Sequence, residues 1–153
     1  MFDSLHEECG VFGVFENQTT TVAQTAYLAL FALQHRGQES CGIAVSDTSG
    51  PKGKVSSHRD MGLVNEVFTP EILAGLKGNI GVGHVRYSTA GSSTRENAQP
   101  LVLNYLKGTL GLAQNGNLIN APELRRELAE AGFPLDSHDD TETLLAACIL
   151  WGV

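Results

Sequence analysis

Short strand-like segments recur along the chain, and they constrain its fold more than any other feature. Residues 10–15 (GVFGVF), 40–47 (SCGIAVSD) and 79–89 (NIGVGHVRYST) have the length and apolar character of strands. Two further segments, LVLNYL and TLGLAQ, are joined by Lys107-Gly108, which predicts a β-hairpin. Runs of strands with few helices between them indicate an α+β fold in which sheets pack against helices.

Four helices are predicted between and after these strands, one of which, the segment NEVFTPEILAGL (65–76), is interrupted by Pro70. Residues 19–34 carry apolar side chains at helical spacing. Residues 120–132 (NAPELRRELAEAG) form the clearest helix, with Asn120 as its cap. A last helix is expected from near Asp140 and is still apolar at Val153, so we expect the domain to be truncated at its C-terminus.

The composition is that of a folded domain without a basic surface. The 153 residues are 42% hydrophobic and 18% charged, which is typical of a globular protein. Seventeen acidic and ten basic residues give a net charge of −7, and no Lys/Arg run is present, which argues against a nucleic-acid partner. The apolar segments are too short to cross a bilayer, and the N-terminus does not resemble a signal peptide. We therefore expect a cytoplasmic protein with no membrane partner.

The cysteines and histidines indicate neither a disulfide framework nor a metal site. Cys9, Cys41 and Cys148 are odd in number and widely spaced, with no CxxC pair, which favours a reducing compartment. None of the five histidines pairs at the HExxH spacing, so no metal site is predicted.

The segment HRDMGLVN (58–65) matches the catalytic loop of protein kinases at its fixed positions. A glycine-rich phosphate loop and a V-A-I-K strand are missing before it, and no D-F-G follows it. The chain is also too short for a two-lobed kinase. We interpret this match as a coincidence.

Four other segments carry chemistry that fits one purpose. They are ECGVFG (8–13), LQHRGQES (33–40), GHVRYSTAG (83–91), and NGNL (115–118) together with DDTE (139–142). Their cysteine, two arginines, Asn-Gly pair and acid could together bind a zwitterion and attack its amide. Each also has a purely structural interpretation: a buried inert thiol, snorkelling surface arginines, a turn and a helix cap.

The segments LFALQHRGQES, GLVNEVF and HVRYSTAGSSTRENAQP resemble class II glutamine amidotransferases, most closely the glutaminase domain of the amidophosphoribosyltransferase family. The similarity extends from about Glu7 to Glu142. It implies an N-terminal-nucleophile (Ntn) hydrolase fold, a four-layer αββα sandwich with two antiparallel sheets between helix layers. It also implies that glutamine is hydrolysed to glutamate and ammonia. In the complete enzyme the ammonia would convert phosphoribosyl pyrophosphate to phosphoribosylamine.

The resemblance implies that Cys9 is the nucleophile and that residues 1–8 are a propeptide, leaving 9–153 as an incomplete amidotransferase domain. This arrangement is chemically reasonable because an α-amine (pKa about 7.7–8.0) can take the proton of a thiol on the same residue (pKa about 8.5). The same amine can later protonate the departing ammonia. No separate histidine base is then needed.

The resemblance also implies roles for seven further residues. Arg86 and Thr89 would bind the α-carboxylate of glutamine and Asp140 its α-ammonium group. Asn115 and Gly116 would form the oxyanion hole. Arg36 would order the nucleophile loop, and Tyr87 would help to couple the site to the ammonia route.

Two positions depart from the family pattern. The family commonly has His before the Asn-Gly pair, where this chain has Gln114, so the geometry or turnover of the oxyanion hole could be altered. Cys41 occupies a position where a small residue such as Ala is usual, a change that a core tolerates.

The implied partners are L-glutamine and a C-terminal phosphoribosyltransferase domain, in an enzyme that would be a homo-oligomer when complete. No cofactor is expected in this segment. Magnesium, and an iron–sulfur cluster if the complete enzyme has one, would belong with the missing domain. Two other interpretations stay open: another class II amidotransferase such as glucosamine-6-phosphate synthase, and a non-catalytic fragment.

Overall fold

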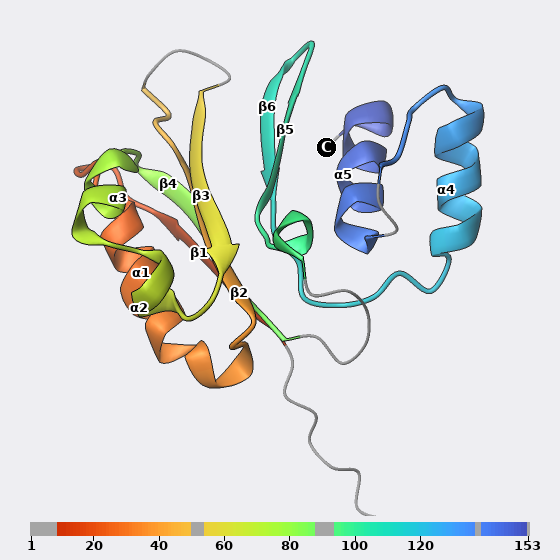
Figure 1. The fold of residues 1–153 in the computed structure, drawn as a ribbon. Coiled ribbons are helices and arrows are strands. Elements are labelled where there is room, and N and C mark those ends of the chain that lie inside the picture. The colour runs from red at the N-terminus through yellow and green to blue at the C-terminus, as the bar shows by residue number, and fades with distance from the viewer. Residues whose placement is uncertain (1–8, 50–53, 88–93, 137–138, 153) are drawn as a thin grey trace, which may run out of the picture.

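The computed structural model describes residues 9–49, 54–87, 94–136 and 139–152. They form four layers in the order helix, sheet, sheet, helix (Figure 1), which confirms the expected α+β sandwich. The helices are α1 (Val22–Ala32), α2 (Val64–Val67), α3 (Pro70–Gly75), α4 (Ala121–Glu130) and α5 (Asp140–Trp151). The strands are β1 (Gly10–Phe15), β2 (Ser40–Ser46), β3 (Val55–Met61), β4 (Ile80–Arg86), β5 (Leu101–Tyr105) and β6 (Gly108–Leu112).

The first sheet is antiparallel throughout and has the strand order β1-β4-β2-β3. Val85 of β4 lies opposite Gly10 of β1 on one side and Cys41 of β2 on the other. Helix α1 covers one face of this sheet because its buried residues Val22 and Leu30 recur on a single stripe. The polar end of β4, at Arg86, lies beside the segments that precede β1 and β2.

The second sheet is the predicted hairpin of β5 and β6. Its turn is Leu106-Lys107, one residue earlier than expected, since Gly108 pairs with Tyr105 as the first residue of β6. The φ of Gly108 is +142°, a backbone conformation that residues with side chains rarely adopt. Helix α5 packs against this hairpin and α4 packs against α5, so the two helices form the fourth layer (Figure 1).

The last two helices begin at the expected positions, but the hydrogen bonds at their N-termini differ from each other. Asn120 is the N-cap residue of α4, as predicted, although its side chain makes no hydrogen bond to the helix. Asp139 caps α5, because its Oδ1 accepts a hydrogen bond from the backbone N–H of Thr141 (2.8 Å). The neighbouring Asp140 is therefore free to turn its carboxylate elsewhere.

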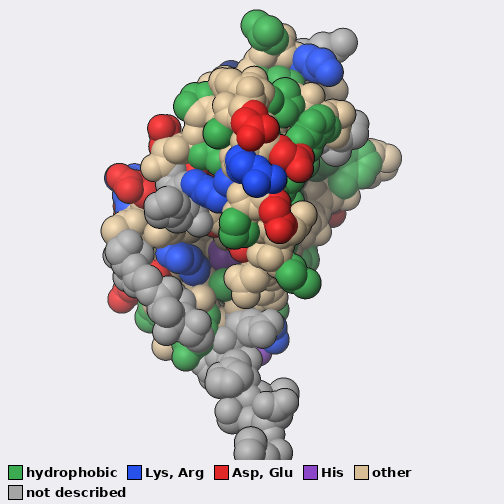
Figure 2. All heavy atoms as spheres, turned by 90° about the vertical axis from the view of Figure 1, so that its right-hand side faces the viewer, with side chains coloured by type: hydrophobic (Ala, Val, Ile, Leu, Met, Phe, Trp, Pro, Cys, Tyr) green, Lys and Arg blue, Asp and Glu red, His purple; other side chains and the backbone are tan. Residues whose placement is uncertain are grey.

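The face beyond α4 is charged with both signs, and Figure 2 shows acidic and basic side chains side by side there. Arg126 and Glu130, one turn apart in α4, form an ion pair (Nε to Oε1, 3.9 Å). At the end of α5 the side chains of Leu150 and Trp151 are exposed, the latter by 55%. Within the described part of the chain, no helix has the length and apolar character needed to span a membrane.

The kinase-like residues have a structural explanation on β3. Arg59 donates hydrogen bonds to the carbonyls of Glu96 and Ala98, and so ties the 3₁₀ turn η2 (Arg95–Asn97) to the sheet. Asp60 forms an ion pair with Arg95 (3.5 Å). These contacts fix the segment leading into β5, consistent with a coincidental match.

Candidate active site

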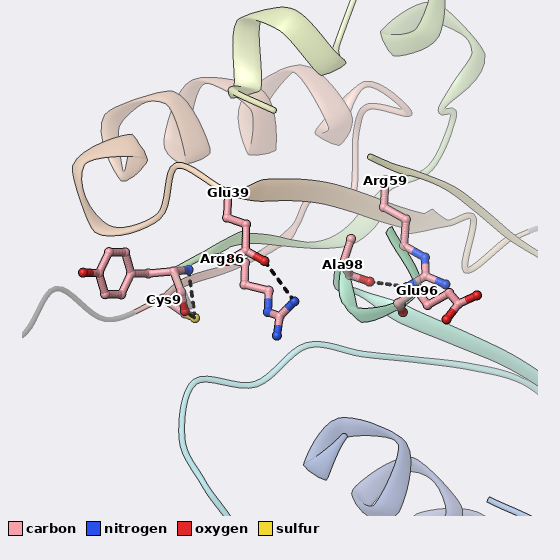
Figure 3. A network of polar contacts seen from close by, with 7 residues as sticks. Cys9, Glu39, Arg59, Arg86, Glu96 and Ala98 are labelled. Atoms are coloured by element: carbon pink, nitrogen blue, oxygen red, sulfur yellow. Dashed lines mark hydrogen bonds and ion pairs between the residues drawn. The ribbon is translucent and has the colours of Figure 1, made fainter. Parts of the chain in front are cut away.

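Cys9 lies directly before β1, with its side chain partly buried beside the end of β4. The backbone N–H of Tyr87 donates to Cys9 Sγ (3.4 Å), and the Sγ–H can donate to the Tyr87 carbonyl (3.5 Å). Figure 3 shows this contact. It follows from the pairing of β1 with β4, which brings the residues before Gly10 and after Arg86 together. The backbone directly after β4 therefore positions the thiol.

The carbonyl oxygen of Cys9 accepts two side-chain hydrogen bonds. One comes from Arg36 Nε (3.3 Å), in the 3₁₀ turn η1 (Gln34–Arg36), and the other from Asn115 Nδ2 (2.8 Å), in the segment after β6. Arg36, Tyr87 and Asn115 thus converge on Cys9 from positions 27, 78 and 106 residues further along the chain. Three of the residues expected in the site lie around the expected nucleophile.

The LQHRGQES segment forms a tight turn that brings Arg36 to this position. Gln34 donates from Nε2 to the carbonyl of Gly37 (2.5 Å), and its Oε1 accepts the backbone N–H of Val64 in α2 (2.7 Å). A Cβ atom on Gly37 would lie only 2.6–2.7 Å from backbone atoms of Arg86. Glycine is therefore needed at this position for the turn to pack directly against the end of β4.

Arg86 is paired with a carboxylate that the sequence did not single out. Its Nη1 donates to Glu39 Oε1 (3.2 Å), and the two side chains are only 17% and 16% exposed (Figure 3). The backbone N–H of Glu39 also donates to the carbonyl of Arg86 (3.1 Å). The sequence did hold one signal for this pair: Glu39 directly precedes the strand β2, and β2 pairs with β4, which ends at Arg86. Glu39 orients the guanidinium expected to bind substrate.

Asp140 is directed at the loop that contains the Asn-Gly pair. Its Oδ2 accepts the backbone N–H of Leu118 (2.7 Å), whereas the capping of α5 is done by Asp139. The interpretation of Asp140 as a simple helix cap is therefore wrong. Gly116 lies in the same loop, between Asn115 and Leu118. Thr89 and the expected propeptide of residues 1–8 lie outside the described residues.

Two titratable groups on the neighbouring strands are held neutral. Burial raises the pKa of the Cys41 thiol to about 12, and the carboxylates of Asp60 and Glu66 add to the effect. Burial also lowers the pKa of His84 on β4 to about 4. Cys41 is consequently unsuited to act as a nucleophile at neutral pH.

The donor set of the site suits an organic zwitterion. Guanidinium, amide and backbone N–H groups can receive a carboxylate or a developing oxyanion, and the Asp140 carboxylate can receive an ammonium group. In the part of the chain that the structure describes, no group of three or more His, Cys, Asp or Glu side chains could hold a metal ion.

Comparison with known proteins places this geometry in a family. The family model described as a glutamine amidotransferase domain matches residues 74–153, just over half of the chain. The amidophosphoribosyltransferase of Synechococcus elongatus is 49% identical over 151 residues, which are 99% of this chain and 29% of that protein. The enzyme of the same name from Methanothermobacter thermautotrophicus is 46% identical over 92% of this chain and 29% of its own length.

The fold comparison agrees. The solved structure of glutamine phosphoribosylpyrophosphate amidotransferase from B. subtilis, complexed with ADP and GMP, matches with a TM-score of 0.78 and 38% identity. The match covers 92% of this chain and 29% of that one, so the chain spans less than a third of the length of these relatives. The four layers are those of the Ntn-hydrolase fold. The chain belongs to the glutamine amidotransferase domain family, among relatives named amidophosphoribosyltransferase.

Proposed function

We propose that this chain is the glutamine-hydrolysing part of an amidophosphoribosyltransferase. In the complete enzyme the ammonia released here would pass to phosphoribosyl pyrophosphate and give phosphoribosylamine. The observation that carries the proposal is the convergence of Arg36, Tyr87 and Asn115 on Cys9. Family membership supports the same reaction.

Cys9 is the nucleophile of this reaction. Removal of residues 1–8 frees its α-amine, which takes the Sγ proton. The thiolate attacks the side-chain amide carbon of glutamine, forming a C–S bond and an oxyanion. The C–N bond then breaks, ammonia leaves with the proton from the α-ammonium group, and a thioester is formed. Water hydrolyses the thioester to glutamate and restores the thiol.

Asn115 and Gly116 stabilise the oxyanion. The amide nitrogen of Asn115 carries two N–H groups, of which one donates to the Cys9 carbonyl (2.8 Å). The second N–H is available to the oxygen that develops beside Sγ, together with the backbone N–H of Gly116. Removing one donor of this kind lowers kcat by about 10²–10³-fold in comparable enzymes.

Substrate recognition falls to the charged groups around Cys9. Glu39 engages Nη1 of Arg86, and the remaining guanidinium N–H groups form a fork for the α-carboxylate. Thr89 would add a further contact to that carboxylate. Asp140 uses Oδ2 for the Leu118 N–H, which leaves Oδ1 for the α-ammonium group. An amino acid with both charges is then selected over a simple amide.

Tyr87 lies beside Cys9, directly after β4. Its backbone holds the Cys9 thiol, while its side chain is 40% exposed directly after β4. We propose that it helps to direct ammonia towards a phosphoribosyltransferase domain that uses magnesium. The complete protein would be a homo-oligomer.

The test is the intact mass of the purified chain before and after exposure to a diazo ketone analogue of glutamine. The proposal expects the loss of residues 1–8 and the gain of one covalent adduct. Cys9→Ala should gain none. Cys41→Ala is the matched control, because this thiol is fully buried and should not react, so that variant should label like the wild type.

A second form separates processing from chemistry. In it, Met is placed directly before Cys9, so that the host aminopeptidase exposes the cysteine without any self-processing. An adduct on this form alone would contradict the propeptide but support the nucleophile. No adduct on either form, with the chain folded by circular dichroism, would contradict the proposed function.

A further inference from the structure

The residue that precedes the Asn115-Gly116 pair is held at three atoms by three different elements. The backbone N–H of Gln114 donates to Gln99 Oε1 (2.8 Å), and its carbonyl accepts a hydrogen bond from His84 Nε2 (3.1 Å). Its side chain donates from Nε2 to Thr141 Oγ1 at the start of α5 (3.3 Å). One residue thus joins β4, the segment before β5, and α5.

The groups that hold Gln114 are themselves fixed. The side chains of His84 and Thr141 are fully buried, and Gln99 is only 5% exposed. Gln99 is pressed against β2, where a Cβ atom on Gly42 would overlap the Gln99 carbonyl. Rigid neighbours of this kind allow a hydrogen bond to define a position and not merely to satisfy a polar atom.

The bond from His84 acts on the orientation of Asn115. A peptide unit is planar and trans, so fixing the direction of the Gln114 carbonyl also fixes the N–H of Asn115 on the opposite side of the same plane. The Cα atom of Asn115 is bonded to this nitrogen, and it carries the side chain that reaches Cys9. We propose that His84 is a positioning residue for the oxyanion-stabilising loop, acting through the carbonyl of Gln114.

This inference rests on the proposed function, since it assigns His84 to the oxyanion step of that reaction. The ring has one state in which it can play the role. The Gln114 carbonyl can only accept a hydrogen bond, so Nε2 carries the donated proton, while Nδ1 is buried without a hydrogen-bond partner among the described residues. Burial lowers the pKa of His84 to about 4, which keeps this neutral donor form throughout the neutral range. His84 therefore positions the loop and does not transfer protons.

Three variants of the full chain test the proposal. His84→Met fills a similar volume but removes the donor, whereas His84→Gln restores an N–H at the ε position. Asn79→Leu is the control for lost stability. It removes buried hydrogen bonds with Thr48 at the opposite end of β4 from Cys9.

Two measurements are made on each variant: kcat and KM for glutamine, and amide hydrogen exchange at residues 115–118. His84→Met should lower kcat by about 10- to 100-fold with little change in KM, because a misplaced oxyanion donor affects the transition state more than the ground state. Exchange at residues 115–118 should become faster. His84→Gln should recover most of both values, and Asn79→Leu should change neither.

The outcomes separate this inference from the function on which it rests. Unchanged kcat in His84→Met, or an equal loss in Asn79→Leu, would overturn it. If His84→Met does not fold, Gln99→Met removes another of the three anchors of Gln114 and is judged by the same two measurements. A wild-type chain without glutaminase activity would contradict the proposed function, while hydrogen exchange would still decide whether His84 holds the loop.

Discussion

Two cysteines lie on either side of β4 at the same end of the sheet, and their surroundings are opposite. Cys41 pairs across the sheet with Val85, and Cys9 directly precedes Gly10, which also lies opposite Val85. Cys41 is fully buried among apolar side chains. Cys9 is partly exposed, and loops bring backbone, guanidinium and amide groups to it.

The difference shows that the strand fixes where a thiol lies, whereas the loops decide what it can do. Burial raises the pKa of Cys41 to about 12, so its reactive thiolate is almost absent at neutral pH. The groups around Cys9 come from η1, from the end of β4 and from the segment after β6. Reactive positions are commonly built in this way, on loops held by a rigid scaffold.

The largest expected effect is a difference in alkylation between these thiols. At about pH 8, a thiol with the pKa of Cys41 is about 10³-fold less ionised than an ordinary free cysteine, and its burial slows the reaction further. Peptide mass spectrometry after iodoacetamide treatment should therefore find Cys9 modified and Cys41 unmodified in the folded chain. In urea both should react. Rapid modification of native Cys41 would break the comparison.

Removing the amide that reaches Cys9 should have the next largest effect. Asn115→Leu keeps the size of the side chain but removes the donor, and we expect kcat for glutamine hydrolysis to fall by about 10²–10³-fold. KM should change little, because the oxyanion exists only in the transition state. Steady-state ammonia release measures both constants. A fall of less than about threefold would show that Asn115 only anchors the Cys9 carbonyl.

Local patterns were sufficient to predict the elements that carry the site. Residues 10–15 and 40–47 were predicted as strands, and β1 and β2 lie there, because buried strands need continuous apolar runs. The hairpin turn was predicted at residues 107–108 and lies at 106–107, because the sequence pattern is compatible with either register of the two strands. The strongly apolar and strongly periodic segments were thus predictable to within a few residues.

Contacts between distant segments were not predictable from such patterns. Glu39 and Arg86 are 47 residues apart, and only the register of β2 against β4 brings them together. Asp139 and Asp140 have the same side chain, and the path of the chain into α5 decides which of them caps the helix. Such contacts depend on tertiary packing, which local sequence propensities do not describe.

His84 is the second group that burial holds neutral, and pH can test this. Below the ordinary histidine pKa of about 6.5, the unfolded chain binds a proton that the folded chain excludes, so the free energy of unfolding falls as the pH falls. Because burial lowers the pKa of His84 to about 4, its contribution to this loss should reach about 3 kcal/mol near that pH and then level off.

Urea unfolding of wild type and His84→Gln between about pH 7.5 and pH 4 isolates this effect, since the other groups titrate in both chains. The free-energy difference between them should shift by about 3 kcal/mol in favour of the variant as the pH falls. Parallel pH profiles would show that His84 is accessible to protons in the folded state. The interior next to β4 would then differ less from the polar surroundings of Cys9.

The smallest effect concerns two glycines on the Cys9 side of the sheet. A Cβ atom on Gly37 would lie 2.6–2.7 Å from the backbone of Arg86, whereas one on Gly13 in β1 would meet nothing within 4 Å. We expect Gly37→Ala to lower the free energy of unfolding by about 1–3 kcal/mol, because backbone must move to relieve the overlap. Gly13→Ala should be close to neutral.

Urea unfolding combined with glutamine titration distinguishes a general loss of stability from a displaced site. The atoms that the new methyl group would push belong to Arg86, the residue expected to bind the α-carboxylate. Gly37→Ala should therefore weaken glutamine binding as well as stability, whereas Gly13→Ala should affect neither. If Gly37→Ala were destabilised but bound glutamine normally, the turn at Gly37 would support only the fold. The polar surroundings of Cys9 would then not depend on the close packing of this turn against β4.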